Sequence, residues 1–181
     1  LGEHGWFGSG WMYEESMRVP LLISTNLAKN STNRIAKLVQ NLDLTPTILD
    51  YAEVKNIDKF QGKSLKPLIE SIDSNITWRE SIYYHFNEFP GSEMVAKHNG
   101  IRTSDYKLIH FYQFDEWEFF DLRKDPFEEN NLYGNESYRI SINDIKRTLG
   151  ATRKFYQDKT DISIMPNEWR KKYRGPELRK E

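Results

Sequence analysis

The pattern of apolar and polar residues changes character near the middle of the chain. In the first half, Arg18 to Ser24 is a short apolar run that ends in polar residues, which is consistent with a buried strand. Asp43-Leu44-Thr45-Pro46 is typical of a helix start, because proline is tolerated in the first turn. Ser64 to Ser71 predicts a further short helical turn. Apolar residues recur on one face of the first helix, at Leu44, Ile48, Leu49 and Ala52.

The second half is rich in β-branched and aromatic residues and predicts a set of strands. The expected strands are Arg79–Phe86, Gly100–Thr103, Tyr106–Tyr112 and Glu116–Leu122. Ser104-Asp105 is short enough to be a tight hairpin turn, so an antiparallel meander is favoured. Apolar residues at helical spacing then predict a long amphipathic helix over Tyr138–Tyr156.

These elements predict an α+β fold, in which a small antiparallel sheet of about four strands packs against the long C-terminal helix. A polar stretch from Asp73 to Thr77 separates the two halves. We therefore expect three parts: residues 1–72, a C-terminal α+β subdomain over residues 73–165, and a basic tail over residues 166–181.

Composition and charge exclude several classes of protein. The chain has 181 residues, of which 38% are hydrophobic and 14% aromatic, so it can bury a core. A net charge of −1 argues against a nucleic-acid partner, and no apolar run approaches the ~18 residues of a membrane span. The absence of cysteine excludes disulfides, cysteine metal sites and a cysteine nucleophile.

The first residues do not resemble a native N-terminus. The run LGEHGWFGSGWMYEES has four glycines in its first ten residues, with aromatic residues and the pair Glu14-Glu15 nearby. Glycines cluster where the backbone bends sharply or approaches another group closely. We interpret this run as a functional loop cut from a larger protein, with Glu14 and Glu15 bracing it.

No complete catalytic set follows from the residues alone. Glu3, His4, Glu14 and Glu15 cluster in sequence, but a metal site requires ligands that converge in space. The chain has no G-x-S-x-G elbow, no Walker loop and no G-x-G-x-x-G segment after a strand. The residues by themselves indicate part of a larger protein that carries an aromatic α+β domain.

Several blocks of the chain resemble type I sulfatases, which depend on formylglycine. LGEHGWFGSGWMYEESMRVPLLI is similar to the segment that follows the Ser-Asp-His/Asn-Gly metal motif of that family. Four later blocks look like sulfatase C-terminal regions: NLDLTPTILDYAEV, GKSLKPLI, HNGIRTSDYKLIHFY and EWEFFDLRKDPFEENNLYGN. The resemblance covers residues 1 to 156 and is nearest to bacterial N-acetylglucosamine-6-sulfatases, mucin-desulfating and heparan-type sulfatases.

The resemblance implies that residues 1–72 are the end of an alkaline-phosphatase-like α/β catalytic domain. It also implies a parent enzyme that hydrolyses sulfate esters on glycosaminoglycan or mucin amino sugars. Its formylglycine nucleophile and its calcium ion would both lie upstream of Leu1, so we expect no metal ligand and no activity in this chain alone. The role expected for the chain is to close the pocket and select the sugar.

The family pattern also implies site residues, with one departure. The family has a sulfate-binding lysine at the position of Ser9, and a neutral hydroxyl cannot replace an ammonium group on sulfate. His4 adjoins the missing metal motif and is expected to support the pocket from behind its ligands. The residues expected to contact the sugar are His98, in a loop before Gly100, together with Arg102 and Trp117.

The expected partners are a sulfated carbohydrate and the N-terminal catalytic half of the parent, without nucleic acid or membrane. Because the run after Arg18 would normally be covered on both faces, an uncovered copy could pair with a second chain. The parent is expected to be periplasmic or secreted in a bacterium, or lysosomal in a eukaryote. Two alternatives stay open: a non-catalytic carbohydrate-binding or scaffold module, and a phosphatase or phosphonate hydrolase of the same superfamily.

Overall fold

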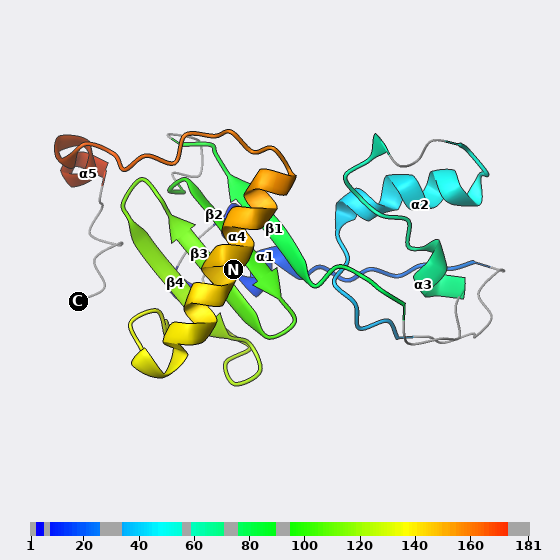
Figure 1. Cartoon of the computed structure of the whole chain (residues 1–181), viewed down its shortest axis with the longest axis horizontal. Coiled ribbons are helices and arrows are strands. Elements are labelled where there is room, and N and C mark those ends of the chain that lie inside the picture. Colours follow the sequence, from blue (N-terminus) through cyan, green and yellow to red (C-terminus); the bar gives the residue numbers. More distant parts are fainter. Residues whose placement is uncertain are drawn as a thin grey trace. The chain divides into compact units, whose positions relative to one another are not determined.

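The computed structural model describes residues 3–5, 8–25, 34–55, 59–70, 76–89 and 95–173 (Figure 1). The chain divides into two compact units. The first unit combines Leu1–Val19 with Tyr83–Glu181, and the second is Pro20–Ile82. The domain boundaries predicted after residues 72 and 165 concern the longer parent protein, and they stay a prediction. Within this chain, the first residues belong to the same compact unit as the C-terminal sheet.

The first unit is built on a four-stranded sheet whose order follows the sequence. The strands are β1 (Ser81–Phe86), β2 (His98–Thr103), β3 (Tyr106–Phe111) and β4 (Glu116–Asp121). β2 pairs antiparallel with β3, and β3 pairs antiparallel with β4. The two-residue turn at Ser104-Asp105 is closed by the Thr103 Oγ1 atom, which accepts a 2.9 Å hydrogen bond from the Tyr106 N–H group. The predicted α+β fold and hairpin are thus confirmed.

One face of the sheet is covered by the long helix α4 (Arg139–Phe155). A short 3₁₀ turn, Glu136–Tyr138, leads into it, and the Asn135 side chain accepts a hydrogen bond from the Ser137 N–H group there. Apolar residues of α4 and of this face form one core cluster, namely Ile101, Leu108, Phe119, Ile142, Ile145 and Leu149. The helix lies one residue inside each end of the predicted range.

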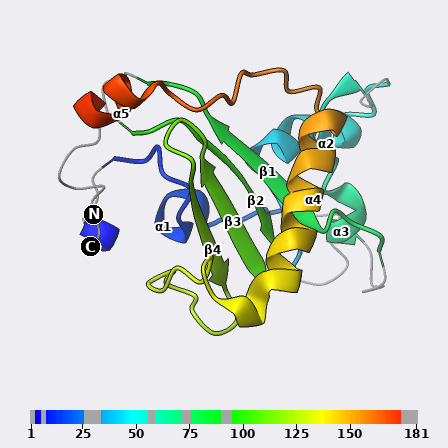
Figure 2. The same cartoon turned by 60° about the vertical axis from the view of Figure 1, so that its left-hand side comes forward.

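The opposite face is covered by the N-terminal segment, which we define as residues 10–17. It contains buried Trp11, Met12 and Tyr13 and the single turn α1 (Glu14–Met17). These residues pack with Ile109, Phe111 and Phe120 of the sheet. Figure 2 shows α1 and α4 on opposite sides of the strands.

Gly100 permits this close packing between the N-terminal segment and the sheet. A Cβ atom at position 100 would lie 2.3 Å from the Met12 Sδ atom and 2.4 Å from the Leu108 carbonyl oxygen. A side chain there would therefore push the segment away from β2.

Two local predictions were wrong. Residues 18–25 form no strand, and Leu22 is 93% exposed, because a strand requires a hydrogen-bonding neighbour and the described part of the chain provides none. His98 was expected in a loop, but β2 begins at His98. The pairing of Asn99 with His110 extends the ladder towards that residue.

The second unit is smaller and holds the 3₁₀ turn Asn41–Asp43, α2 (Leu44–Tyr51) and α3 (Lys66–Glu70). Its centre is the buried Asp43 carboxylate, which forms a bidentate ion pair with Arg79 and accepts the N–H groups of Gln40 and Lys63. Burial raises the pKa of Asp43, but these donors outweigh burial and hold that pKa below its usual range. The apolar residue Ile48 of α2 remains largely exposed.

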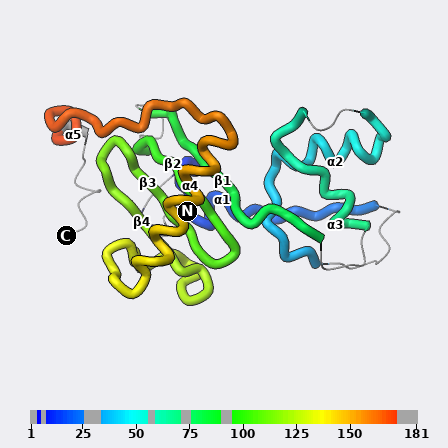
Figure 3. Tube along the Cα trace, in the orientation of Figure 1, coloured from blue at the N-terminus to red at the C-terminus, as the bar shows by residue number. Residues whose placement is uncertain are grey.

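After α4 the chain runs past the end of the sheet to α5 (Asn167–Tyr173), as the tube in Figure 3 shows. The Met165 N–H group donates to the Gln113 carbonyl oxygen at 2.9 Å, which ties this segment to the turn after β3. Of the predicted basic tail, residues 174–181 lie outside the described residues. In the described part of the chain, no helix has the length and apolarity needed to cross a membrane.

Candidate functional site

A buried ionic network joins the N-terminal segment to the sheet, and we call it the Lys107 network: Glu14, Arg102, Lys107 and Glu128. The Lys107 Nζ atom lies 2.6 Å from a Glu128 oxygen and 2.9 Å from a Glu14 oxygen. Arg102 donates to both oxygens of Glu14 at 3.3 Å. The Glu14 N–H group donates to Glu128 at 2.7 Å. Three distant parts of the chain are thereby held at one point.

Burial makes this network sensitive to the loss of any member. The side chains of Lys107 and Glu128 have no exposed area. Burial raises the pKa of Glu14, but Arg102 and Lys107 outweigh burial and lower it overall. Burial also raises the pKa of Glu128 and is only partly offset by Lys107. A buried charge that loses its partner is strongly destabilising, so the network fixes where the N-terminal segment lies.

A tyrosine and a second acidic group add to this attachment. The Tyr13 hydroxyl group donates to Glu118 of β4 at 2.8 Å, and burial together with that carboxylate raises the Tyr13 pKa far above its ordinary value. Tyr13 also stacks on His4, with ring centroids 4.1 Å apart. The predicted bracing role of Glu14 is confirmed.

One group of described residues could approach a cation: His4, Glu15 and Glu128, whose ligand atoms lie within 4.8 Å of one another. His4 Nε2 lies 3.3 Å from Glu15, and both line a surface cavity of about 370 Å³. However, calcium prefers six to eight oxygen ligands, and the Lys107 ammonium group already supplies positive charge to Glu128. These residues therefore do not fit the calcium site that a sulfatase requires.

His98 lies inside the core rather than at a surface. Its side chain is fully buried among Trp11, Tyr84, Phe86 and Phe111, with ring centroids 5.0 to 6.4 Å away. Nδ1 lies 2.8 Å from the Ala96 carbonyl oxygen. Burial lowers the His98 pKa to about 4, so the imidazole is neutral at physiological pH.

The other predicted sugar contacts are divided between the two faces of the sheet. Arg102 lies on the same face of the sheet as His98, and its guanidinium group forms an ion pair with Glu14. Trp117 pairs with His110 in the ladder and lies on the face of α4, stacked on His110 at 3.6 Å and covered by Lys146 at 3.9 Å. The roles of His98, Arg102 and Trp117 in binding sugar stay predictions, and the chain does not bring the three together. Ser9 is exposed, beside Gly8 with a φ of 90°.

Sequence reasoning missed Lys107 and Glu128. Lys107 precedes the buried residues Leu108 and Ile109 in β3, and a lysine in a mostly apolar strand is the one local signal of a buried ion pair. Glu128 stands in a turn with several other acidic residues, a composition that gives no local sign of burial. Its carboxylate is buried only because the turn folds back against the N-terminal segment.

A second polar cluster lies on the α4 side of the sheet, and we call it the His85 cluster: Tyr83, His85, Tyr112 and Asp158. His85 Nδ1 lies 2.8 Å from Asp158, and His85 Nε2 lies 3.1 Å from the Tyr112 hydroxyl group. Tyr83 also donates to Asp158. Burial raises the Tyr112 pKa to about 12, so its phenol stays protonated and is not a nucleophile.

Comparisons with known proteins agree on one family. The family model for N-sulphoglucosamine sulphohydrolase, C-terminal, matches residues 2–155. The chain is 42% identical over 160 residues to an N-acetylglucosamine-6-O-sulfatase of Bacteroides thetaiotaomicron, covering 87% of this chain and 29% of that protein. It is 37% identical over 154 residues to an arylsulfatase of Clostridium perfringens, covering 82% of this chain and 30% of that protein.

A solved structure supports the same conclusion. That protein, in complex with its substrate D-glucosamine-2-N,6-O-disulfate, is 41% identical to this chain with a TM-score of 0.63, covering 68% of this chain and 25% of its own. The chain thus spans less than a third of the length of the curated relatives it matches.

Proposed function

Since this chain belongs to the sulfatase family, as a C-terminal region of the N-sulphoglucosamine sulphohydrolase type, we propose that it is part of a longer enzyme that hydrolyses sulfate esters on sugars. The observation that carries the proposal is the match over residues 2–155 together with 42% identity to a sugar sulfatase. The relatives are sulfuric ester hydrolases, and each is more than three times as long as the matched region.

Within that enzyme, the chain's proposed role is to close the substrate pocket and help select the sugar. The Lys107 network supports this role, because it fixes the N-terminal segment and with it the loop that carries Ser9. The residues that the structure describes do not form a calcium site, and the sequence contains no Cys/Ser-x-Pro-x-Arg motif from which formylglycine is made. The metal ion and the formylglycine of the family would be provided by the rest of the enzyme.

The proposed substrate is a 6-O-sulfated amino sugar of a glycosaminoglycan or mucin chain, by analogy with the relatives that act on N-acetylglucosamine 6-sulfate. The proposed location of the enzyme is periplasmic or secreted, or lysosomal in a eukaryotic cell. A carbohydrate polymer of this kind would be met outside the cytosol.

The test is an assay of the longer protein on matched esters. We expect sulfate release from N-acetylglucosamine 6-sulfate to exceed hydrolysis of phenyl phenylphosphonate, a phosphonate monoester, by at least about a hundredfold in kcat/KM, which is ~2.7 kcal/mol in transition-state free energy. Faster cleavage of the phosphonate would favour the hydrolase branch of the superfamily. No turnover of either ester would favour a non-catalytic module.

The chain by itself is proposed to be inactive. Calorimetry should detect no calcium binding in the micromolar range, because the described residues offer too few oxygen ligands. An assay with a small aryl sulfate should show no protein-dependent turnover. Micromolar calcium binding, or turnover by the chain alone, would contradict this division of roles.

A further inference from the structure

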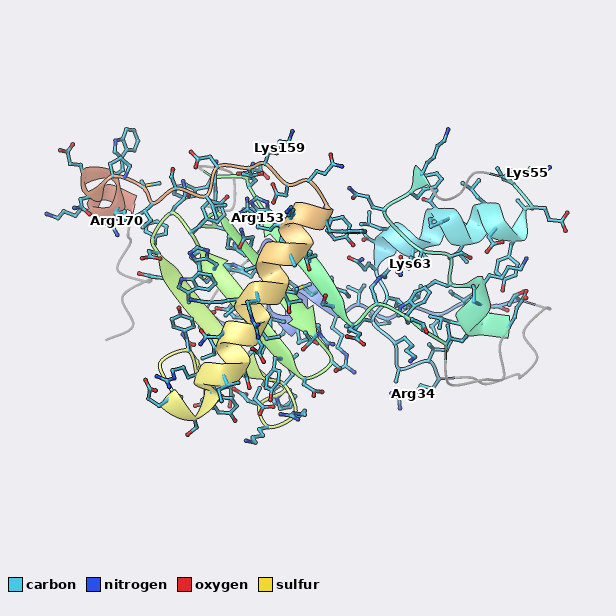
Figure 4. All side chains as sticks on the ribbon, viewed as in Figure 1. Arg34, Lys55, Lys63, Arg153, Lys159 and Arg170 are labelled. Atoms are coloured by element: carbon cyan, nitrogen blue, oxygen red, sulfur yellow. The ribbon has the colours of Figure 1, made fainter. Side chains whose placement is uncertain are left out.

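Cationic side chains surround a surface cavity at the C-terminal end of α4. The cavity has a volume of about 510 Å³ and is lined by Arg153, Lys154, Gln157, Asp158 and Lys159. Figure 4 labels Arg153 and Lys159 at this end of the helix. The lining carries three cations and one carboxylate, so its formal charge is +2, whereas the whole chain has a net charge of −1.

The single carboxylate of the cavity, Asp158, is occupied by donors from the protein. It accepts hydrogen bonds from Tyr83 and from the Thr160 N–H group, and it lies 2.8 Å from His85 Nδ1 and 3.5 Å from Arg153 Nε. Burial raises the Asp158 pKa, but these donors outweigh burial and hold it well below its usual range. Asp158 is therefore ionised, and its negative charge is directed towards the sheet and Arg153.

Lys154 and Lys159 have no such partner. Both are exposed, and neither forms an ion pair with any residue that the structure describes. Between them Gln157 adopts a left-handed backbone, with a φ of 53°. Arg153, by contrast, is tied to the protein, because it pairs with Asp158 and donates to the Thr160 carbonyl oxygen at 2.9 Å. The cavity thus combines one fixed guanidinium group with two uncompensated ammonium groups.

The helix dipole accounts for only part of this arrangement. Cations in the last turn of a helix are favoured by the partial negative charge there, which explains the sign of Arg153 and Lys154. Lys159 lies beyond the helix and is not explained in this way. The dipole amounts to about half an elementary charge, so it does not cancel the +2 of the lining.

We propose that this cavity binds the sulfate group of a sulfated sugar chain. Lys154 and Lys159 would be the direct ligands, and the guanidinium group of Arg153, held by Asp158 and Thr160, would line the cavity beside them. Charge-assisted hydrogen bonds from ammonium and guanidinium groups are the interactions that bind sulfate oxygens most strongly. The choice of a sulfated sugar among anions rests on the proposed function. Because the lysines are exposed, the affinity should fall as ionic strength rises.

The test uses the chain as it stands and a heparin-derived tetrasaccharide as the probe, in calorimetry at low ionic strength. The double variant Lys154→Gln/Lys159→Gln should lose at least tenfold in affinity. The matched control is Arg139→Gln/Arg147→Gln, which removes the same charge from the same helix but at exposed arginines that already pair with Glu136 and Asp144. The control should change affinity less than twofold.

Four results would overturn the proposal. Equal losses in both double variants would indicate diffuse electrostatic attraction, and no loss in the lysine variant would mean that the cavity is not the site. Equal binding of a desulfated tetrasaccharide, or of a single-stranded oligonucleotide of the same charge, would exclude selective sulfate recognition. Since the readout is binding to this chain, loss of the site and absence of sulfatase activity in the longer protein are separate outcomes.

Discussion

The Lys107 ammonium group has carboxylates of Glu14 and Glu128 within 3 Å and no exposed area. At the scale of single residues, this is the contact on which the attachment of the N-terminal segment depends. Replacement of Lys107 by methionine keeps the length of the side chain but leaves the buried Glu128 carboxylate beside that of Glu14 with no ammonium group between them. Removal of one partner of a buried ion pair typically costs about 3–5 kcal/mol.

We therefore expect Lys107→Met to lower the free energy of unfolding by ~3–5 kcal/mol in urea titration. The variant Lys107→Met/Glu128→Gln should regain at least ~1 kcal/mol of this loss, because one of the unpaired charges is gone. A single variant as stable as the parent chain would show that the ammonium group is not needed there.

The resemblance predicts that Ser9 takes the place of a sulfate-binding lysine of the family, so position 9 offers a gain-of-function test in the longer protein. Ser9→Lys should raise kcat/KM for a small aryl sulfate by about tenfold or more, because an ammonium group stabilises charge on the sulfate oxygens. Ser9→Gln, of similar reach but neutral, should give no increase. If both variants behaved alike, position 9 would not face the sulfate.

Buried His98 and partly buried His110 predict how stability depends on pH. The pKa values of His98 and His110 are lowered from 6.5 to about 4 by burial, so the unfolded chain binds their protons more readily than the folded chain does. The contribution of these histidines to the free energy of unfolding should accordingly be fully present above pH 6.5 and should decrease as the pH approaches 4. For His98 the decrease should be up to about 3 kcal/mol. Asp43, Asp121 and Asp158, whose pKa values are lowered from 3.8, titrate below this window.

Urea titrations at several pH values between 7 and 5 would measure this slope. His98→Phe, which fits the surrounding aromatic side chains, should remove roughly half of it. An unchanged slope in that variant would mean that other groups take up the protons.

At the scale of elements, α4 illustrates how one face of a helix supplies most of its stabilisation. Ile142, Ile145 and Leu149 are buried against the sheet, whereas Ile140 on the same helix is 77% exposed. Ile145→Ala should lower the free energy of unfolding by about 2–4 kcal/mol, because it deletes buried methyl groups and leaves a cavity. Ile140→Ala should change it by less than ~0.5 kcal/mol. Similar losses at both positions, measured in urea, would contradict the packing of α4 described above.

At the scale of the whole molecule, the chain exposes a run of large apolar residues. Val19, Leu21, Leu22 and Ile23 are all exposed and follow one another along the chain. In an extended conformation, both faces of this segment would carry apolar side chains. That pattern is expected for a strand that is covered on both faces of a parallel sheet. Such an uncovered segment favours pairing with a second copy.

We expect light scattering to show association of the chain as its concentration rises, and Leu22→Asp to reduce it by at least about tenfold in dissociation constant, or ~1.4 kcal/mol. Phe155→Asp is a matched control, since Phe155 is also largely exposed but lies on α4. A strict monomer at high concentration would contradict the prediction, as would an equal effect of the two variants.

The sequence by itself determined the elements of the C-terminal sheet and its helix. Alternating aromatic and β-branched residues, a two-residue turn and the 3.6-residue spacing from Tyr138 are local signals, and each strand and helix formed within two residues of its predicted ends. The family also followed from the sequence, because the order of its short blocks is specific.

Only the tertiary structure decided which faces those elements present and what covers them. The N-terminal segment packs on the second face of the sheet, and the register of the strands places Arg102 and His98 on that face and Trp117 on the other. Lys107 and Glu128 are far apart in sequence, so no local pattern could reveal their ion pair. Residues 18–24 have the composition of a strand but form none, because a strand exists only where another strand supplies its hydrogen bonds.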